Sequence, residues 1–215
     1  MIIGKLSTRI GGNFHRNIHP EKFVQFIYNP DYLRNYKKWR NTISDGYAIC
    51  EKIDIKPSRS DIVIDGGNVV KGKNKVIMTS KIFKENSQYE EKELIRLLIE
   101  KLEVEDVIII PQEPKDIFGH ADGMVRFLDD NTVLINDYRN EKNQEFCINF
   151  RMSLHNAKLD YISIPYNPYN NETDRDATGV YINYLRMKFC IFIPLFGLKE
   201  DDVTIKQFEE LFGGI

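Results

Sequence analysis

A short motif in which a polar residue precedes a glycine recurs along this chain at nearly constant spacing. It occurs as Ile64-Asp65-Gly66, Ala121-Asp122-Gly123 and Ala177-Thr178-Gly179, so its glycines are 57 and then 56 residues apart. After each glycine the sequence predicts apolar strands and then a helix, and in the first two copies a further strand closes the unit. Units of this size cannot bury both faces alone and must pack against one another. The sequence therefore predicts an α/β fold built from ββαβ repeats.

The predicted repeats cover residues 60–115, 116–170 and 171–215, with a partial unit at 22–59, all within one domain at 1–215. A helix at 90–102 is expected because four leucines share one of its faces, namely Leu94, Leu97, Leu98 and Leu102. β-branched runs too short for helices indicate the strands. The predicted strands are 22–28, 60–64, 74–79, 107–111, 124–128, 132–136, one that ends at Pro165, 180–185 and 188–194. The other predicted helices are 47–53, 143–157 and 203–212.

Composition excludes several classes of partner. The chain has 30 Lys and Arg against 32 Asp and Glu, a net charge of −2, which argues against nucleic acid as the main partner. No apolar run approaches the roughly 18 residues that a membrane span needs, and the N-terminal segment around Arg9 and Arg16 has no signal-peptide pattern. Three widely spaced cysteines, Cys50, Cys147 and Cys190, indicate buried thiols in a reducing cytoplasm rather than a disulfide framework.

The first and third junctions carry amide and carboxylate side chains. In Asp65-Gly66-Gly67-Asn68 the double glycine lets the backbone turn tightly or lets a ligand approach closely. Asn183 lies within an apolar stretch, where its amide is either satisfied by the protein or directed at a ligand. Both interpretations stay open for each junction.

The second junction pairs a histidine with a carboxylate. In an extended segment His120 and Asp122 would point to the same side, and the carboxylate would raise the pKa of the imidazole and suit it to proton transfer. The alternatives are a simple surface contact or a metal site with Asp116, but no second histidine lies at ligand spacing, so no metal is expected. If the repeats surround one axis, Asp65, Asn68, His120, Asp122 and Asn183 converge on one site.

Read together, these junctions resemble the agmatine deiminase and Porphyromonas-type peptidylarginine deiminase family. The matching stretches are 61–68, 76–79 followed by Asn86, 118–123, 179–184 and 194–202, so the resemblance covers residues 22–215. It implies the pentein fold, an α/β propeller of five ββαβ units, of which this chain has about three and is expected to be incomplete at both ends.

The resemblance also implies a chemistry. Members hydrolyse a guanidinium to a ureido group and ammonia through a cysteine thiouronium intermediate, without metal or organic cofactor. His120 would be the acid and base, Asp122 would be the second catalytic residue and would hold the guanidinium, and Asp65, Asn68 and Asn183 would bind the substrate. The expected substrate is agmatine, a precursor in putrescine biosynthesis, or a related arginine-like guanidinium. Members that act on C-terminal peptidyl arginine carry arginines after a Tyr-Asn pair, whereas here Tyr28-Asn29 is followed by Pro30 and Asp31, which would repel a substrate carboxylate.

The chain departs from the family pattern at two places. Residues 1–21 lack the tryptophan and Arg-Asp pair that carry the first guanidinium carboxylate, and no cysteine follows the helix at 203–212. We therefore expect this chain alone to be inactive. The alternative is a non-catalytic guanidinium- or polyamine-binding or interaction protein, and homo-oligomerisation is left open.

Overall fold

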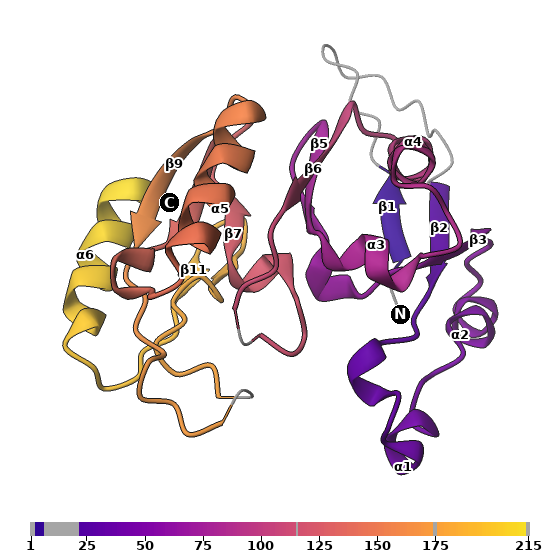
Figure 1. Cartoon of the computed structure of the whole chain (residues 1–215), viewed down its shortest axis with the longest axis horizontal. Helices are drawn as coiled ribbons and strands as arrows, with labels where there is room; N and C mark the ends of the chain where they lie inside the picture. Colours follow the sequence, from indigo (N-terminus) through magenta and orange to yellow (C-terminus); the bar gives the residue numbers. More distant parts are fainter. Residues whose placement is uncertain (1–2, 7–21, 115, 174–175, 214–215) are drawn as a thin grey trace. The chain divides into compact units, whose positions relative to one another are not determined.

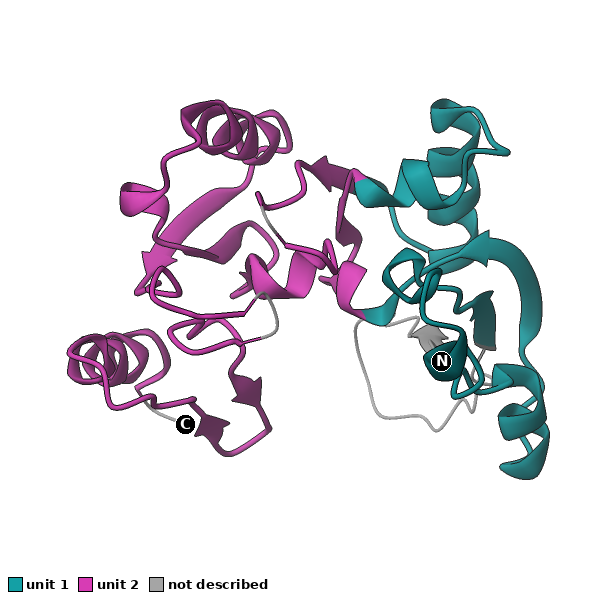
Figure 2. Ribbon diagram, turned by 60° about the horizontal axis from the view of Figure 1, so that its bottom comes forward, with its two compact units in different colours: residues 1–66, 81–107 teal, residues 67–80, 108–215 magenta. Residues whose placement is uncertain are grey.

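The computed structural model describes residues 3–6, 22–114, 116–173 and 176–213 (Figure 1). The N-terminal segment around Arg9 and Arg16, for which no signal peptide was predicted, lies outside the described residues. The chain divides into two compact units, one of residues 1–66 and 81–107 and the other of residues 67–80 and 108–215 (Figure 2). Within the described residues, no helix combines the length and the apolar character needed to cross a bilayer.

The first unit is built on a three-stranded sheet in the order β1-β2-β3. Its strands are β1 (Ile3–Leu6), β2 (Lys22–Ile27) and β3 (Ser58–Val63). β2 is antiparallel to β1 and parallel to β3, so a crossover connection must join β2 to β3. That connection contains the short helices α1 (Lys37–Arg40) and α2 (Gly46–Lys52), and the Asp45 carboxylate caps α2 by accepting the N–H groups of Tyr47 and Ala48.

Two further helices of the first unit follow in the chain, α3 (Lys81–Glu85) and α4 (Glu91–Leu102). α4 confirms the predicted helix and its apolar face, because Leu94, Leu98 and Leu102 are buried. The acidic residues in its first turn stabilise the helix by interacting with the positive end of its dipole. α3 was not predicted from the sequence.

Two further sheets share one strand order, and their strands belong to the second unit apart from Asp106 and Val107. The first is β4-β5-β6, from β4 (Val70–Lys71), β5 (Lys75–Thr79) and β6 (Asp106–Ile110). The second is β7-β8-β9, from β7 (Val125–Phe127), β8 (Thr132–Asn136) and β9 (Asp160–Ile164). In the second sheet β8 is antiparallel to β7 and parallel to β9, and α5 (Gln144–Asn156) supplies the crossover.

Helices cover both faces of the β7-β8-β9 sheet. Val133 and Ile135 of β8 pack in one cluster with Phe146 and Phe150 of α5. Leu134, which points to the opposite face, packs in a second cluster with residues of α6 (Glu200–Phe212). Burial on both sides explains why β8 is a continuous apolar run rather than an alternating one.

Two copies of the predicted repeat are visible in the order of elements. A 3-10 turn at Gly66–Asn68 precedes β4, β5, the helices α3 and α4, and β6. A 3-10 turn at Ala121–Gly123 precedes β7, β8, α5 and β9. The mixed α/β architecture and the ββαβ order are therefore confirmed for these copies. The number of propeller units and the single-domain boundaries stay predictions.

The third copy differs from its prediction. The strands expected at 180–185 and 188–194 shorten to β10 (Leu185–Arg186) and β11 (Ile191–Phe192), so those predicted extents are wrong. Gly179 has φ +82 and contacts the backbone of Asn167, and the N–H of Asn167 donates to the Gly179 carbonyl. This turn takes the backbone out of the extended conformation, while Tyr181 and Ile182 remain buried in the cluster with α6.

Candidate functional site

The segment that carries His120 and Asp122 is a short loop shaped by Asp116. The Asp116 carboxylate accepts the backbone N–H groups of Phe118 at 2.8 Å and His120 at 3.0 Å. Asp116, one of the candidate metal ligands in the sequence, therefore serves as a turn-forming residue. Among the described residues, no group of three His, Cys, Asp or Glu side chains is arranged to hold a metal ion.

The local conformation corrects one step of the sequence reasoning. His120 is extended, with φ −87 and ψ 128, but Ala121–Gly123 forms a 3-10 turn. Successive side chains of a 3-10 turn are rotated by about 120°, so strand alternation does not put His120 and Asp122 on one side. The expected extended geometry is wrong because Asp116 curls the chain into a turn at this point. Both side chains are partly buried.

Buried polar side chains hold the loop at both ends. The Thr79 hydroxyl, at the end of β5, donates to the carbonyl of Gly119 at 2.7 Å. The Asn136 Nδ2 group, at the end of β8, donates to the carbonyl of Gly123 at 2.7 Å. His120 and Asp122 thus lie between two fixed backbone carbonyls.

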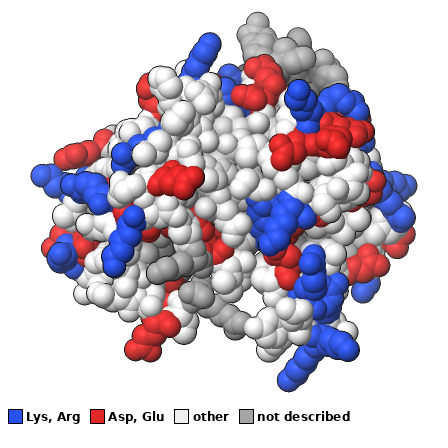
Figure 3. Space-filling view, in the orientation of Figure 1, with Lys and Arg blue, Asp and Glu red and all other residues white. Residues whose placement is uncertain are grey.

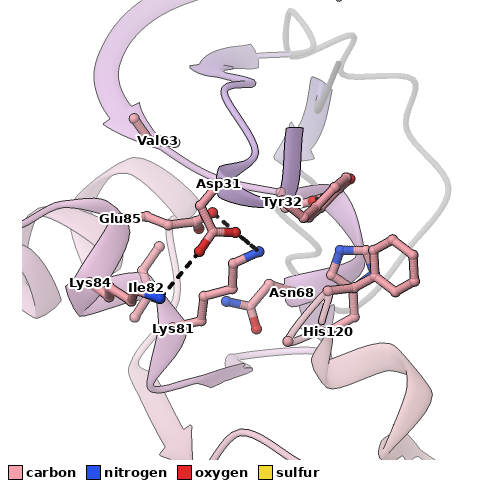
Figure 4. Close-up of polar contacts among 12 residues, drawn as sticks. Asp31, Tyr32, Val63, Asn68, Lys81, Ile82, Lys84, Glu85 and His120 are labelled. Atoms are coloured by element: carbon pink, nitrogen blue, oxygen red, sulfur yellow. Dashed lines mark hydrogen bonds and ion pairs between the residues drawn. The ribbon is translucent and has the colours of Figure 1, made fainter. Parts of the chain in front are cut away.

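The Gly66-Gly67-Asn68 turn lies against the same loop. A Cβ at Gly67 would meet the His120 ring, which shows that the missing side chain makes room for the imidazole. Asn68 is fully buried and its Oδ1 accepts the N–H of Thr79 at 2.7 Å. Asn68 and His120, both labelled in Figure 4, are therefore linked through the end of β5. Within the described residues the Nδ2 group of Asn68 has no hydrogen-bond partner.

Asp65 belongs to the first unit and is buried, with 6% of its surface exposed. The Tyr32 hydroxyl donates to its Oδ2 at 3.1 Å, and the hydroxyls of Tyr28 and Tyr32 are 3.0 Å apart. Burial, the bond to Tyr28 and the charge of Asp65 raise the pKa of Tyr32, so the phenol stays a donor. The Asp65 carboxylate thus already accepts a hydrogen bond from the protein, at Oδ2. Its role in binding a substrate stays a prediction.

A buried lysine neutralises Asp31 in the first unit (Figure 4). The Lys81 side chain is 2% exposed, and its ammonium lies 3.1 Å from the Asp31 carboxylate and 3.2 Å from that of Glu85. Lys84 adds a second cation at 3.5 Å from Asp31. Burial opposes ionisation of Asp31, but both lysines lower its pKa overall, whereas burial raises the pKa of Glu85. Asp31 is therefore charge-compensated, which removes the basis for expecting it to repel a substrate carboxylate.

Asn183, the predicted residue of the third junction, is exposed and follows a turn instead of lying in an apolar strand. Its backbone N–H donates to the Val180 carbonyl at 3.4 Å. In the described part of the chain its side chain forms no hydrogen bond, so its amide is open to solvent. The structure does not link Asn183 to the loop at 119–123.

The three cysteines differ in environment. Cys50 and Cys147 are buried as predicted, and burial raises the pKa of the Cys147 thiol, whose Sγ lies 3.9 Å from the Tyr138 carbonyl. Cys190 is exposed, so the prediction that it is buried is wrong. It lies between β10 and β11, in a hairpin with Phe189 and Phe192 also exposed. The short strands leave this apolar stretch outside the core.

Sequence reasoning overlooked Thr79, Asn136 and the turn-forming role of Asp116. The available signal was positional. In Val76-Ile77-Met78-Thr79 and in Val133-Leu134-Ile135-Asn136, a polar residue ends an otherwise apolar buried strand. Such a residue requires a hydrogen-bond partner nearby, and the partner is the loop that carries the histidine.

The fold agrees with comparisons to solved structures. An agmatine deiminase from C. jejuni matches 90% of this chain, with TM-score 0.66 and 18% identity. An agmatine deiminase from Enterococcus faecalis also matches 90%, with TM-score 0.66 and 18% identity. These likenesses show that the chain has the fold of the agmatine deiminases, which is the pentein fold. Comparison with curated proteins gave no match.

The family follows from a match along nearly the whole sequence. Residues 9–215 match the model of the Porphyromonas-type peptidyl-arginine deiminases, so the chain belongs to that family and the expected resemblance is confirmed. It spans 58% of the C. jejuni structure and 62% of the E. faecalis structure.

Proposed function

We propose that this chain supplies the guanidinium-binding and proton-transfer residues of a guanidine deiminase that acts on agmatine or a related arginine-like guanidinium. The observation that carries the proposal is the loop at 119–123, which presents His120 and Asp122 between two hydrogen-bonded carbonyls in a chain of this family. A carboxylate suits the planar, forked donors of a guanidinium. A fixed imidazole suits repeated proton transfer near neutral pH.

The proposed reaction has two balanced steps. A cysteine thiolate attacks the guanidinium carbon, the C–N bond breaks, and His120 as imidazolium gives its proton to the departing ammonia. The neutral imidazole then takes one proton from water, whose oxygen attacks the same carbon. The C–S bond breaks to release the thiolate, and the second water proton passes to the released ammonia, leaving a neutral ureido product and ammonium. With agmatine as substrate, the product leads toward putrescine. No metal or organic cofactor takes part.

The proposed mechanism needs a cysteine nucleophile next to His120, and the environments of the three cysteines of this chain do not favour any of them for that role. Cys147 is buried with a raised pKa, which disfavours its thiolate, and Cys50 is fully buried in the first unit. Cys190 is exposed and lies between β10 and β11, outside the loop at 119–123. We therefore propose that the chain binds a guanidinium and releases no ammonia on its own. A guanidinium- or polyamine-binding protein is the second candidate, favoured by the same burial of two of the thiols.

The charge balance of the chain argues against a polyanion as its main ligand. On the face drawn in Figure 3, basic and acidic side chains are interspersed, without a continuous basic stripe. The net charge of −2 likewise does not favour nucleic acid as the main partner. We propose a cytoplasmic location and leave self-association to measurement.

Calorimetric titration with agmatine tests the proposal. Asp122→Asn should weaken binding by about tenfold or more, because a charge-assisted hydrogen bond is worth about 1.5–3 kcal/mol. The exposed Asp160 provides a matched control, since Asp160→Asn changes the net charge equally. Arginine and 1,4-diaminobutane serve as comparison ligands. Equal affinity for the diamine would indicate a polyamine-binding protein, and unchanged binding by Asp122→Asn would reject the proposed role of Asp122.

An ammonia assay tests the catalytic part separately. We expect no ammonia from agmatine with the chain as it stands. Turnover that disappears with His120→Ala but survives replacement of all three cysteines would contradict the covalent mechanism. Turnover that disappears with Cys190→Ala alone would identify Cys190 as the nucleophile.

A further inference from the structure

We propose that Thr79 and Asn136 are positioning residues that set the placement of His120 and Asp122. This inference rests on the proposed function only in treating those two side chains as the chemical groups. Neither Thr79 nor Asn136 would touch the substrate. Each would act through the backbone of the loop at 119–123.

The two side chains occupy equivalent places in successive repeats. Thr79 ends β5 and Asn136 ends β8, each the second strand after a 3-10 turn. Both residues are fully buried. Each reaches a backbone carbonyl of the same loop, Gly119 for Thr79 and Gly123 for Asn136, and both distances are 2.7 Å. The bonded carbonyls lie directly before His120 and directly after Asp122.

These bonds fix the loop because neither donor has an alternative in solvent. A buried donor without a partner costs about 1–3 kcal/mol, so movement of either carbonyl would leave an unsatisfied polar group. A valine or leucine would continue the apolar strands at both positions without that requirement. The polar residues therefore add constraint to the loop where apolar residues would add only packing.

Further contacts anchor the two donors themselves. The N–H of Thr79 donates to Asn68 Oδ1 at 2.7 Å, so Thr79 also ties the turn at 66–68 to the loop. The Asn136 Nδ2 group lies 3.3 Å from the Tyr138 hydroxyl as well as bonding Gly123. Tyr138 is buried and packs edge-on against Phe146 and Phe150 of α5. Thr79 and Asn136 are thus each held by a further contact within the unit.

Substitutions that remove only the donating group test this inference. Thr79→Val is isosteric and keeps the packing, whereas Thr79→Ser restores a hydroxyl. Thr204 offers a matched control in the same unit, because it is fully buried and its hydroxyl donates to the Glu200 carbonyl within α6 at 2.8 Å. Thr204→Val removes the same kind of bond at a place that does not touch the loop. Asn136→Leu removes the donor of the second hydrogen bond, the one to the Gly123 carbonyl.

The decisive readouts report on the loop rather than on global stability. Hydrogen exchange of the Phe118 and His120 amides, which bond Asp116, should quicken about tenfold in Thr79→Val, as expected for loss of about 1.4 kcal/mol. The imidazole resonances of His120 should shift, and agmatine affinity should fall by a similar factor. Thr79→Ser should recover all three, and Thr204→Val should lower stability without changing any of them.

The outcomes separate this inference from the proposed function. If the unaltered chain does not bind agmatine, the proposed function fails, but the exchange and imidazole measurements still decide the positioning role. Equal and purely global effects of Thr79→Val and Thr204→Val would overturn that role. So would a Thr79→Val chain that fails to fold while Thr204→Val folds, since Thr79 would then be a structural residue. If only Asn136→Leu fails to fold, Thr79→Val decides.

Discussion

The imidazole of His120 lies directly against the backbone of Gly67. A Cβ built on Gly67 would lie 2.2 Å from Nδ1 of His120 and 2.6 Å from its Cγ. Real Cβ atoms do not approach other atoms so closely, so any side chain at Gly67 must displace the ring. The second glycine of the Asp65-Gly66-Gly67-Asn68 motif is therefore required by a close approach of a side chain, not by its backbone angles.

Gly67→Ala should move His120 and destabilise the chain. We expect a loss of about 1–3 kcal/mol, which is typical when a methyl group is forced into a packed site. Urea unfolding measures the loss, and the imidazole resonances of His120 report its displacement. Gly123→Ala is the control, because a Cβ there has no atom within 4 Å. A Gly67→Ala chain as stable as Gly123→Ala, with unchanged imidazole signals, would contradict this packing.

How far the sequence predicts this structure depends on the kind of interaction. The helix around Leu94 was located because its buried face is periodic, and β8 matched its predicted residues 132–136. The third copy was misjudged because apolar residues such as Tyr181 and Ile182 can be buried from a turn as well as from a strand. Periodicity records burial, and it does not record the backbone conformation that achieves it.

The site was predictable in its residue types and not in its geometry. His120 and Asp122 were found because of their chemistry, but their relative direction depends on Asp116 bonding the N–H groups of two later residues. The compensation of Asp31 depends on Lys81, 50 residues away in the sequence. Pairings over such distances leave no local pattern in a single sequence.

Glu113 should make stability fall as pH rises. Burial raises its pKa from 4.5 to about 7, against the lowering effect of the hydrogen bond from Tyr166. When the pKa of a carboxyl is higher in the folded than in the unfolded chain, its contribution to folding stability is fully present below the unfolded pKa. That contribution is lost as the pH rises through the pKa of the folded chain. Between pH 5 and pH 8 the unaltered chain should lose about 2–3 kcal/mol from this group.

Glu113→Gln should abolish that loss, because the amide can still accept the Tyr166 proton but does not ionise. Urea unfolding at pH 5 and pH 8 measures the difference, with the exposed Glu145→Gln as the control. The two chains should be similar at pH 5, and Glu113→Gln should be the more stable at pH 8. Parallel pH profiles for the unaltered chain and Glu113→Gln would show that Glu113 ionises normally.

Asp201 should have the opposite pH dependence. The Tyr181 hydroxyl donates to it at 2.6 Å, and the N–H groups of Phe196 and Gly197 also donate to its carboxylate. The bond from Tyr181 and these backbone bonds lower the pKa of Asp201 below 3.8. The contribution of ionised Asp201 to folding stability is therefore complete above the ordinary pKa of 3.8. It is lost as the pH falls through the lowered pKa of the folded chain.

Asp201→Asn should be less stable than the unaltered chain at pH 7, and the gap should narrow below pH 4. The neighbouring Asp202 is exposed, so Asp202→Asn controls for the loss of an acidic residue in the first turn of α6. Thermal unfolding at both pH values tests the difference. A gap that is constant with pH, or equal for both variants, would contradict the special role of Asp201.

Phe150→Ala should be the most damaging of these changes, because Phe150 joins α5 to the strand that precedes it. The ring is fully buried, stacks on Phe146 at 5.9 Å between centroids and meets Tyr138 edge-on at 5.6 Å. Truncation of a buried phenylalanine costs about 3–5 kcal/mol. Met152, on the exposed side of α5, is the control, and Met152→Ala should change stability by less than about 0.5 kcal/mol. Because Tyr138 also contacts Asn136, Phe150→Ala should in addition speed hydrogen exchange in the loop at 119–123. Faster exchange confined to α5 would show that the aromatic cluster and the loop are independent.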